Sequence, residues 1–253
     1  MDRQNLFASF ASGSSGNCFL FQSGGVCGLI DAGISLRRIE GSLEQFGLKL
    51  SDVQFVLITH EHSDHISGLM QMLKKARPLL FVPRQIFKFM ESEYPIAEMK
   101  AVQYHSPFKF ESLEITGFNL LHDSTVCYGY RIDSPEFSLG YATDLGQPSI
   151  NATHYLNQVN YLVLESNYDH RMLLTGKYPE FLKRRILSPY GHLDNEIAVG
   201  FLKKVIHPEL KKVMLAHLSK ENNDPEIVRS KFSKNFSGLE IIVAARNTVT
   251  RMF

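Results

Sequence analysis

Short apolar runs recur along the whole chain, and stretches with helical spacing separate them. The runs lie at residues 6–10, 18–22, 26–30, 55–58, 79–82, 113–121, 126–132, 137–142, 161–164, 213–216 and 239–244. Apolar runs of this length, bounded by glycine and polar turn residues, are typical of buried β-strands. The hydrophobic pattern therefore predicts a protein with many short strands, most of them buried.

Apolar positions spaced three and four residues apart mark the helices. Such spacing runs over residues 36–46 and stops near Gly47, which suits a helix C-cap. Further helices are predicted after Ile66 and at 85–93, 178–187 and 195–204. Strands and helices in this order predict an α/β fold with two sheets packed together and helices outside. No repeat or Pro/Gly linker divides the chain, so we expect a single domain spanning residues 1–253.

The composition says more about the cellular compartment of the protein than about the reaction it catalyses. The net charge is +1, so overall electrostatics neither favour nor exclude a polyanionic substrate. We find no secretory signal and no apolar stretch long enough to span a membrane, so no membrane association is expected. The three cysteines, Cys18, Cys27 and Cys127, do not resemble a disulfide framework. These observations predict a cytoplasmic protein.

One polar cluster follows directly after the apolar run 55–58. It contains His60, His62, Asp64 and His65 in the order HxHxDH. Neutral imidazole and carboxylate are ligands that Zn²⁺ and similar divalent ions prefer. A loop at the carboxyl end of a buried strand can fold these side chains around one point. The cluster therefore predicts a metal site.

Three more residues of ligand type follow other apolar runs. His122 follows the run 113–121, Asp144 follows 137–142 after one intervening residue, and His217 follows 213–216. A catalytic metal ion needs about three protein ligands and an open position for water. His122, Asp144 and His217 are therefore the candidates that complete the site.

Taken together, these residues resemble the metallo-β-lactamase superfamily, and the resemblance spans nearly the whole chain. That family folds as an αββα four-layer sandwich with a two-metal site at one edge of its paired sheets. The resemblance implies that three histidines hold the first ion: His60, His62 and His122. It implies that the second ion is held by Asp64, His65 and His217. Asp144 would bridge the two ions, and Asp31 would hydrogen-bond the ligand loop and fix the orientation of the ligands.

Three further motifs narrow the subgroup to YycJ/WalJ-type members. They are Ser12-Gly13-Ser14-Ser15-Gly16-Asn17, Gly191-His192-Leu193-Asp194-Asn195 and the segment from His217 to Asn223. The resemblance implies a nuclease, which in that group is a 5′→3′ DNA exonuclease. The segment Ala216-His217-Leu218-Ser219 is also similar to a His-x-Ser segment of tRNase Z enzymes.

The implied site suits phosphodiester hydrolysis. Two nearby divalent ions lower the pKa of a bridging water, so a metal-bridging hydroxide can attack near neutral pH. Asp64 and Asp144 would orient that nucleophile and receive its proton. Zn²⁺ suits the ligands best, and Mn²⁺ and Ni²⁺ also tolerate them. His192, in a turn before a predicted helix, would contact the scissile phosphate or protonate the leaving group, as in tRNase Z-like enzymes; the alternative is a histidine that bonds the backbone at the helix entry. Glu165 would either orient His192 or lie at the surface.

Substrate contacts have weaker signals. The turn containing Ser14, Ser15 and Asn17 offers hydroxyls and backbone N–H groups to a phosphate, although a plain hairpin turn fits equally well. Basic pairs and triplets in the last third could form a phosphate-binding face or a solvated surface. They are Lys183-Arg184-Arg185, Lys203-Lys204 and Lys211-Lys212.

Two other functions remain open. A thioesterase of the glyoxalase II type shares the ligand set and differs in the bond that is cleaved. A metal-bearing scaffold that binds nucleic acid without catalysis is the non-enzymatic alternative. A true β-lactamase is disfavoured, because no cysteine occupies a ligand position and no signal peptide is seen. The sequence does not decide between DNA and RNA or fix the oligomeric state.

Overall fold

The structure is a computed structural model that describes residues 5–93, 99–103 and 105–253. The chain divides into two compact units. The amino-terminal unit comprises the residues up to Gln103 together with 124–126 and 245–253. The carboxyl-terminal unit comprises 104–123 and 127–244. The single-domain organisation expected from the sequence stays a prediction.

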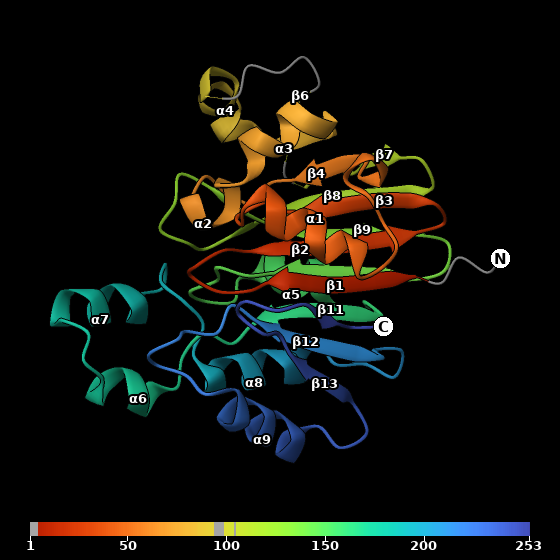
Figure 1. The fold of residues 1–253 in the computed structure, drawn as a ribbon. Coiled ribbons are helices and arrows are strands. Elements are labelled where there is room, and N and C mark those ends of the chain that lie inside the picture. The colour runs from red at the N-terminus through yellow and green to blue at the C-terminus, as the bar shows by residue number, and fades with distance from the viewer. Residues whose placement is uncertain (1–4, 94–98, 104) are drawn as a thin grey trace. The chain divides into compact units, whose positions relative to one another are not determined.

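The amino-terminal unit contains a mixed sheet of seven strands in the order β14-β1-β2-β3-β4-β5-β6 (Figure 1). β14, β1, β2 and β3 pair antiparallel, whereas β3 to β6 pair parallel. The parallel strands are short apolar runs with few exposed residues, as expected of strands covered on both faces. The strands are β1 (Leu6–Ala11), β2 (Cys18–Ser23), β3 (Val26–Ile30), β4 (Phe55–Leu57), β5 (Leu79–Pro83), β6 (Met99–Val102) and β14 (Thr250–Arg251).

Helices of this unit follow the parallel strands. They are α1 (Leu36–Glu44), α2 (Ser63–Ile66), α3 (Leu69–Ala76) and α4 (Phe87–Glu93), with 3₁₀ turns at Leu50–Asp52 and Arg84–Ile86. The predicted C-cap of α1 is confirmed. Gly47 has a φ of 69°, and its N–H donates to Glu44 O at 3.0 Å. Leu48 N–H donates to Leu43 O at 3.1 Å, which completes the Schellman pattern.

The carboxyl-terminal unit also contains a mixed seven-stranded sheet, in the order β13-β12-β11-β10-β9-β8-β7. β10 to β13 pair parallel, and β7 to β10 pair antiparallel. The strands are β7 (Phe108–Phe110), β8 (Leu113–Leu120), β9 (Cys127–Asp133), β10 (Ser138–Ala142), β11 (Tyr161–Glu165), β12 (Lys212–Ala216) and β13 (Glu240–Val243). β8 and β10 run in the same direction because each is antiparallel to β9.

Five helices complete this unit: α5 (Ile150–Leu156), α6 (His170–Thr175), α7 (Glu180–Leu187), α8 (Asn195–Val205) and α9 (Pro225–Asn235). α5 packs on β8 to β10 and on α8, and α9 packs on α8 and β13. Their apolar faces form a buried core with the sheet, which includes Leu162, Phe201 and Phe232. α6 and α7 stand apart from α8 and α9 (Figure 1).

The elements predicted from the sequence are present, with ends shifted by one or two residues at most strands. The structure adds strands and helices that the sequence did not predict: β6, β7, β14, α2, α5, α6 and α9. The segment 85–93, predicted as one helix, is a 3₁₀ turn followed by α4. Within the described part of the chain, no helix is both long and apolar enough to cross a membrane.

A close backbone approach fixes the loop after β3 against α2. A Cβ at Gly33 would lie 1.6 Å from Asp64 O, and Ala32 N–H donates to His65 O at 2.8 Å. We therefore expect Gly33→Ala to force the backbone apart and to lower the free energy of unfolding by about 2–3 kcal/mol, as overpacking does. Urea unfolding followed by circular dichroism measures the change.

Gly41→Ala is the matched control for this substitution. Gly41 lies within α1, and a Cβ there meets no atom within 4 Å. Alanine at such a helical position should raise the free energy of unfolding by about 0.5–1 kcal/mol. Equal stability of the two variants would contradict the tight packing of Gly33 on α2.

Candidate metal centre

In the amino-terminal unit, the HxHxDH residues lie at the carboxyl ends of two parallel strands. Thr59 to His62 form the loop after β4, and α2 begins at Ser63 with Asp64 in its first turn. Asp31 directly follows β3, the parallel neighbour of β4. Carboxyl ends of adjacent parallel strands meet at one edge of a sheet, where α/β proteins bind ligands. The strand order therefore places Asp31 beside the candidate ligands.

Asp31 is fully buried and ties this loop together. Its carboxylate accepts hydrogen bonds from Thr59 N–H at 2.9 Å and from the Thr59 hydroxyl at 2.9 and 3.1 Å. Oδ2 also lies 2.7 Å from Nδ1 of His65. Burial raises the pKa of the Asp31 carboxyl, and His65 and Thr59 oppose that rise. The Asp31 carboxylate thus fixes the orientation of the His65 ring through Nδ1, as carboxylates do for metal-binding histidines.

His60 and His62 turn their rings toward each other. Nε2 of His60 and Nδ1 of His62 are 3.0 Å apart, and the ring planes are 78° apart. Two nitrogens bound at about 2.0–2.1 Å to one tetrahedral ion lie about 3.3 Å from each other. The separation of these two nitrogens therefore fits a shared metal ion. The side chain of His60 is fixed from the other side, because Nδ1 lies 3.0 Å from Thr59 Oγ1.

Asn17 joins the glycine-serine turn to α2. Its side chain bonds both backbone groups of Gly13, at 2.8 and 3.2 Å, and its amide nitrogen lies 3.0 Å from Nε2 of His65. Asn17 N–H also donates to Asp64 O at 2.7 Å. Asn17 is 1% exposed, whereas Ser14 and Ser15 are exposed. The structure thus separates the three residues predicted to bind phosphate: Asn17 supports the ligand loop, and the two serines face outward.

In the carboxyl-terminal unit, four chemically active side chains lie at the carboxyl ends of strands that run in one direction. They are His122 after β8, Asp144 after β10, Glu165 at the end of β11 and His217 after β12. β10, β11 and β12 are adjacent parallel strands. Asp144, Glu165, His192 and His217 each offer a ligand atom within 4.8 Å of the others. The sheet therefore gathers the predicted residues of this unit at one edge.

Three of the strand-end residues adopt a left-handed backbone. The φ angles are 60° for Asp31, 60° for Asp144 and 57° for His217. Non-glycine residues in this region are uncommon, and strain of this kind clusters at functional sites. In each case the chain turns sharply at the strand end.

Glu165 is the fully buried centre of the carboxyl-terminal cluster. Its Oε1 lies 2.8 Å from Nδ1 of His192 and 2.9 Å from Nδ1 of His217. Its Oε2 accepts Leu145 N–H at 2.6 Å and Leu193 N–H at 3.3 Å. Burial opposes ionisation, but the charges and hydrogen bonds of the two histidines outweigh it and hold the pKa of Glu165 below its ordinary value. The predicted contact between Glu165 and His192 is present, and the contact with His217 is additional.

His122 is anchored by the backbone instead of a carboxylate. Its Nδ1 lies 3.1 Å from Gly191 O, so Nδ1–H donates to that carbonyl and Nε2 faces the other way. Nε2 lies 3.7 Å from Asp144 Oδ1. Burial lowers the pKa of His122, although Asp144 opposes the shift. A neutral imidazole is the form that binds metal.

The turn that carries His192 is held firmly on both sides. A Cβ at Gly191 would lie 2.1 Å from Ile186 O, so only glycine fits there. Immediately after the turn, Asp194 caps α8 by accepting Glu196 N–H at 2.6 Å. His192 therefore lies just before a helix, as predicted, and its side chain is 21% exposed.

A buried asparagine network behind the cluster was not predicted as part of the site. Asn223 donates to the backbone carbonyls of Ser166 and Asn167, both at 2.9 Å, and Asn195 contacts Ser166 Oγ at 2.6 Å. Asn167 donates to His217 O at 2.7 Å. Asn195 and Asn223 lie within two of the motifs singled out in the sequence. The motifs therefore marked these residues, but they did not indicate that the residues form a buried hydrogen-bond network.

The basic residues that were candidates for a phosphate-binding face lie in different environments. Lys183, expected on a phosphate-binding face, is buried: its Nζ donates to Leu174 O at 2.8 Å and lies 3.3 Å from Glu180. Its long side chain instead links α7 to α6, which corrects that expectation. Lys212 pairs with Glu240 at 3.1 Å. Arg184 and Arg185 remain exposed.

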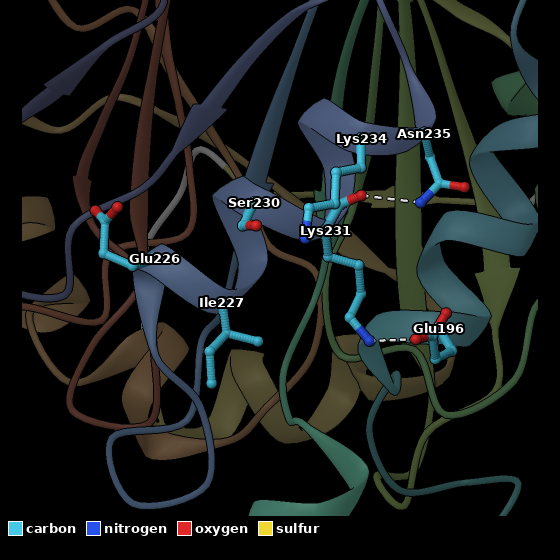
Figure 2. Close-up of a pocket in the computed structure, with 7 residues that line it drawn as sticks. All are labelled: Glu196, Glu226, Ile227, Ser230, Lys231, Lys234 and Asn235. Atoms are coloured by element: carbon cyan, nitrogen blue, oxygen red, sulfur yellow. Dashed lines mark hydrogen bonds and ion pairs between the residues drawn. The ribbon is translucent and has the colours of Figure 1, made fainter.

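A separate pocket lies between α8 and α9 (Figure 2). Lys231 spans it to pair with Glu196, and Asn235 donates to Lys231 O at 2.9 Å. None of the candidate metal ligands lines this pocket. It is therefore distinct from the predicted site.

The donor set fits divalent metal ions. In each unit, the Nδ1 atom of a histidine lies against a buried oxygen, such as that of Asp31, Glu165 or Gly191 O, which fixes the orientation of the ring. This is the pattern by which proteins orient metal-binding histidines. The histidines and carboxylates of both units therefore have the chemistry of a divalent metal site.

Comparison with known proteins agrees with this chemistry. Residues 29–217 match the family described as "Beta-lactamase superfamily domain". The chain is 34% identical over 231 residues to "Exodeoxyribonuclease YycJ" of Bacillus anthracis, covering 90% of this chain and 88% of that protein. It is 33% identical over 226 residues to "Exodeoxyribonuclease WalJ" of Streptococcus pneumoniae, covering 87% of this chain and 84% of the relative.

Solved structures show the same fold. The metallo-β-lactamase fold protein YhfI from Bacillus subtilis superposes with a TM-score of 0.76 at 17% identity, covering 98% of this chain and 100% of that one. The short form of human tRNase Z superposes with a TM-score of 0.65 at 16% identity, covering 96% and 98%. The expected α/β fold of the metallo-β-lactamase type is thus confirmed. The chain belongs to the metallo-β-lactamase superfamily, as a metal-dependent hydrolase of the YycJ/WalJ type.

Proposed function

We propose that this protein is a two-metal phosphodiesterase that degrades DNA from its 5′ ends. The observation that carries the proposal is a set of histidines at the carboxyl ends of the strands whose Nδ1 atoms are held by buried oxygens, the arrangement by which proteins orient metal-binding histidines. Similarity to proteins named exodeoxyribonucleases over about nine-tenths of the chain supports a DNA substrate.

The proposed ligands are those of the superfamily pattern. His60, His62 and His122 hold the first ion. Asp64, His65 and His217 hold the second ion, and Asp144 binds both. Within the amino-terminal unit, the 3.0 Å separation of the His60 and His62 nitrogens supports a shared ion. Within the carboxyl-terminal unit, the Glu165 contact with Nδ1 of His217 supports binding through Nε2. We propose Zn²⁺ as the metal, with Mn²⁺ or Ni²⁺ as substitutes.

The protein side chains supply the remaining chemistry. When bound, the two ions activate a water molecule near neutral pH and neutralise charge on the phosphoryl group. Asp64 and Asp144 orient that water and accept its proton. Asp31 and Glu165 hold the histidines in place, so little reorganisation is needed during the reaction.

His192 has the geometry of a proton donor. Its Nδ1 is engaged with Glu165 at 2.8 Å, and the ring is partly exposed. Nε2 is therefore the nitrogen that can contact the scissile phosphate or protonate the leaving oxygen. The ionised Glu165 keeps the ring in one orientation during that transfer.

The state of the cysteines supports a proposal about the cellular compartment. Cys18, Cys27 and Cys127 are buried free thiols. Buried thiols without disulfides fit a reducing compartment, and we propose the cytoplasm.

Cleavage of end-labelled nucleic acid tests the proposed activity. With added Zn²⁺ or Mn²⁺, the protein should release nucleotides from 5′-labelled duplex or single-stranded DNA. His62→Ala should lower the cleavage rate at least about 100-fold, because it removes one of the proposed metal ligands, on which activation of the water depends. His154→Ala, which removes an exposed histidine of α5, is the matched control and should retain full activity.

Assays with DNA and RNA labelled at the 5′ or the 3′ end measure the polarity of cleavage and the preferred nucleic acid. Release from 3′ ends or internal cleavage would refute the proposed polarity, and a preference for RNA would refute the DNA substrate. If the metal-loaded protein cleaves thioesters and no nucleic acid, the site is that of a glyoxalase II-like thioesterase. Metal-loaded protein that binds nucleic acid without cleaving any substrate would indicate a scaffold.

A further prediction concerns His192. His192→Ala should retain the metal content of the wild-type protein, because His192 is not one of the proposed ligands. Its kcat should fall about 10²–10⁴-fold, the usual contribution of a general acid, with a smaller change in KM. Metal analysis and steady-state kinetics measure both quantities. Loss of metal would instead make His192 a ligand, and unchanged kcat would exclude a role in proton transfer.

A further inference from the structure

The segment from α6 to the turn before His192 concentrates positive charge. Residues 170–190 contain five basic residues, Arg171, Lys177, Lys183, Arg184 and Arg185, and one acidic residue, Glu180. The whole chain has a net charge of only +1. Lys183 is buried and pairs with Glu180, so the exposed cations of this segment are Arg171, Lys177, Arg184 and Arg185. Exposed cations gathered on a short segment are suited to phosphate groups.

Large aromatic side chains on the same segment are exposed. Phe181 of α7 is 74% exposed, and Tyr190 in the following turn is 54% exposed. α6 and α7 have their own small core, in which Leu173 and Ile186 are buried and Leu182 is half-buried. Phe181 is therefore not needed to close this core, because other residues of α7 already do so.

Helical spacing puts an aromatic ring and two cations on one face of α7. Arg184 and Arg185 lie three and four residues after Phe181, the positions that neighbour it along a helix surface. Arg185 pairs with Asp123, the residue that follows the candidate ligand His122. The face that carries Phe181 and Arg185 is thus directed toward the loop after β8.

The turn places Tyr190 close to the same ligand. Tyr190 precedes Gly191, whose carbonyl accepts the hydrogen bond from Nδ1 of His122 at 3.1 Å. His192 N–H donates to Ile186 O at 3.1 Å, which folds the turn back on α7. Since Gly191 has no room for a side chain, the turn is fixed, and Tyr190 has a defined position next to His192.

We infer that Phe181, Arg184 and Tyr190 form a binding track for single-stranded nucleic acid, an inference that rests on the proposed nuclease function. The two rings stack on bases, and Arg184 binds a phosphate between them. Stacking is tolerant of sequence, as a non-specific exonuclease requires.

A second copy of the chain is the competing occupant of this face. In a two-fold dimer the same patch meets itself, so the Arg184 side chains of both copies would approach each other. Repulsion between like charges disfavours that arrangement, whereas a polyanion is attracted. Charge complementarity therefore favours nucleic acid.

The test compares a long and a small substrate. We would measure kcat/KM for 5′-labelled single-stranded DNA and for bis-p-nitrophenyl phosphate, a small phosphodiester that has one phosphate and no bases. Phe181→Ala should lower the ratio of the two values about tenfold, through KM for DNA. Phe181→Tyr, which keeps the ring, should restore it. Ile150→Ala, which removes an 89% exposed side chain from α5, is the control for apolar surface and should leave the ratio unchanged.

Salt dependence tests the cation separately. Arg184→Gln should reduce the slope of log KM for single-stranded DNA against log salt concentration by about 0.7, the value for one phosphate contact. Lys88→Gln, at an exposed lysine of α4, is the matched control and should leave the slope unchanged. Light scattering reports the oligomeric state of each variant.

The outcomes separate this inference from the proposed function. If wild-type protein degrades DNA but the Phe181→Ala ratio and the Arg184→Gln slope stay at wild-type values, the track is refuted and the nuclease stands. If Phe181→Ala keeps the wild-type ratio of the two kcat/KM values but changes the mass measured by light scattering, this face of α7 would instead mediate self-association. Wild-type protein that neither binds nor cleaves nucleic acid would overturn both proposals.

Discussion

The buried carboxylate of Glu165 is the interaction on which the carboxyl-terminal unit depends. An ionised carboxylate taken out of water destabilises a fold by several kcal/mol unless donors satisfy it. Two backbone N–H groups and the Nδ1 atoms of His192 and His217 supply those donors. These partners come from the loop after β10, the entrance to α8 and the end of β12. One carboxylate therefore joins three separate segments of chain at the edge of the sheet.

A buried carboxylate has the same role in the amino-terminal unit. Asp31, at the end of β3, accepts hydrogen bonds from Thr59 and contacts His65, which lie after the neighbouring parallel strand β4. In each unit a buried acid at one strand end thus fixes a histidine that follows the next parallel strand. Such anchoring sets which ring nitrogen can bind a metal and lowers the reorganisation needed when an ion binds. The left-handed backbone at Asp31, Asp144 and His217 turns the chain at these strand ends.

Much of this arrangement was predictable from the sequence, because strands and ligands have local signals. Apolar runs located the strands, polar ligand types directly after them located His122, Asp144 and His217, and the family resemblance added Asp31. Other features depend on contacts between distant residues and have no local pattern. The sharing of Glu165 between two histidines, the close approach of Gly33 to α2 and the burial of Lys183 belong to this class. α9 was missed although Asp224 and Pro225 form a recognisable helix start.

The central claim is that these anchored histidines and carboxylates hold two metal ions in one chain. Metal stoichiometry tests it most directly, by mass spectrometry of protein loaded with Zn²⁺ and dialysed against metal-free buffer. The account predicts two ions per chain for the wild-type protein and a smaller number for Glu165→Ala, which removes the anchor of His217. A single ion per chain, or none, in well-folded wild-type protein would contradict it.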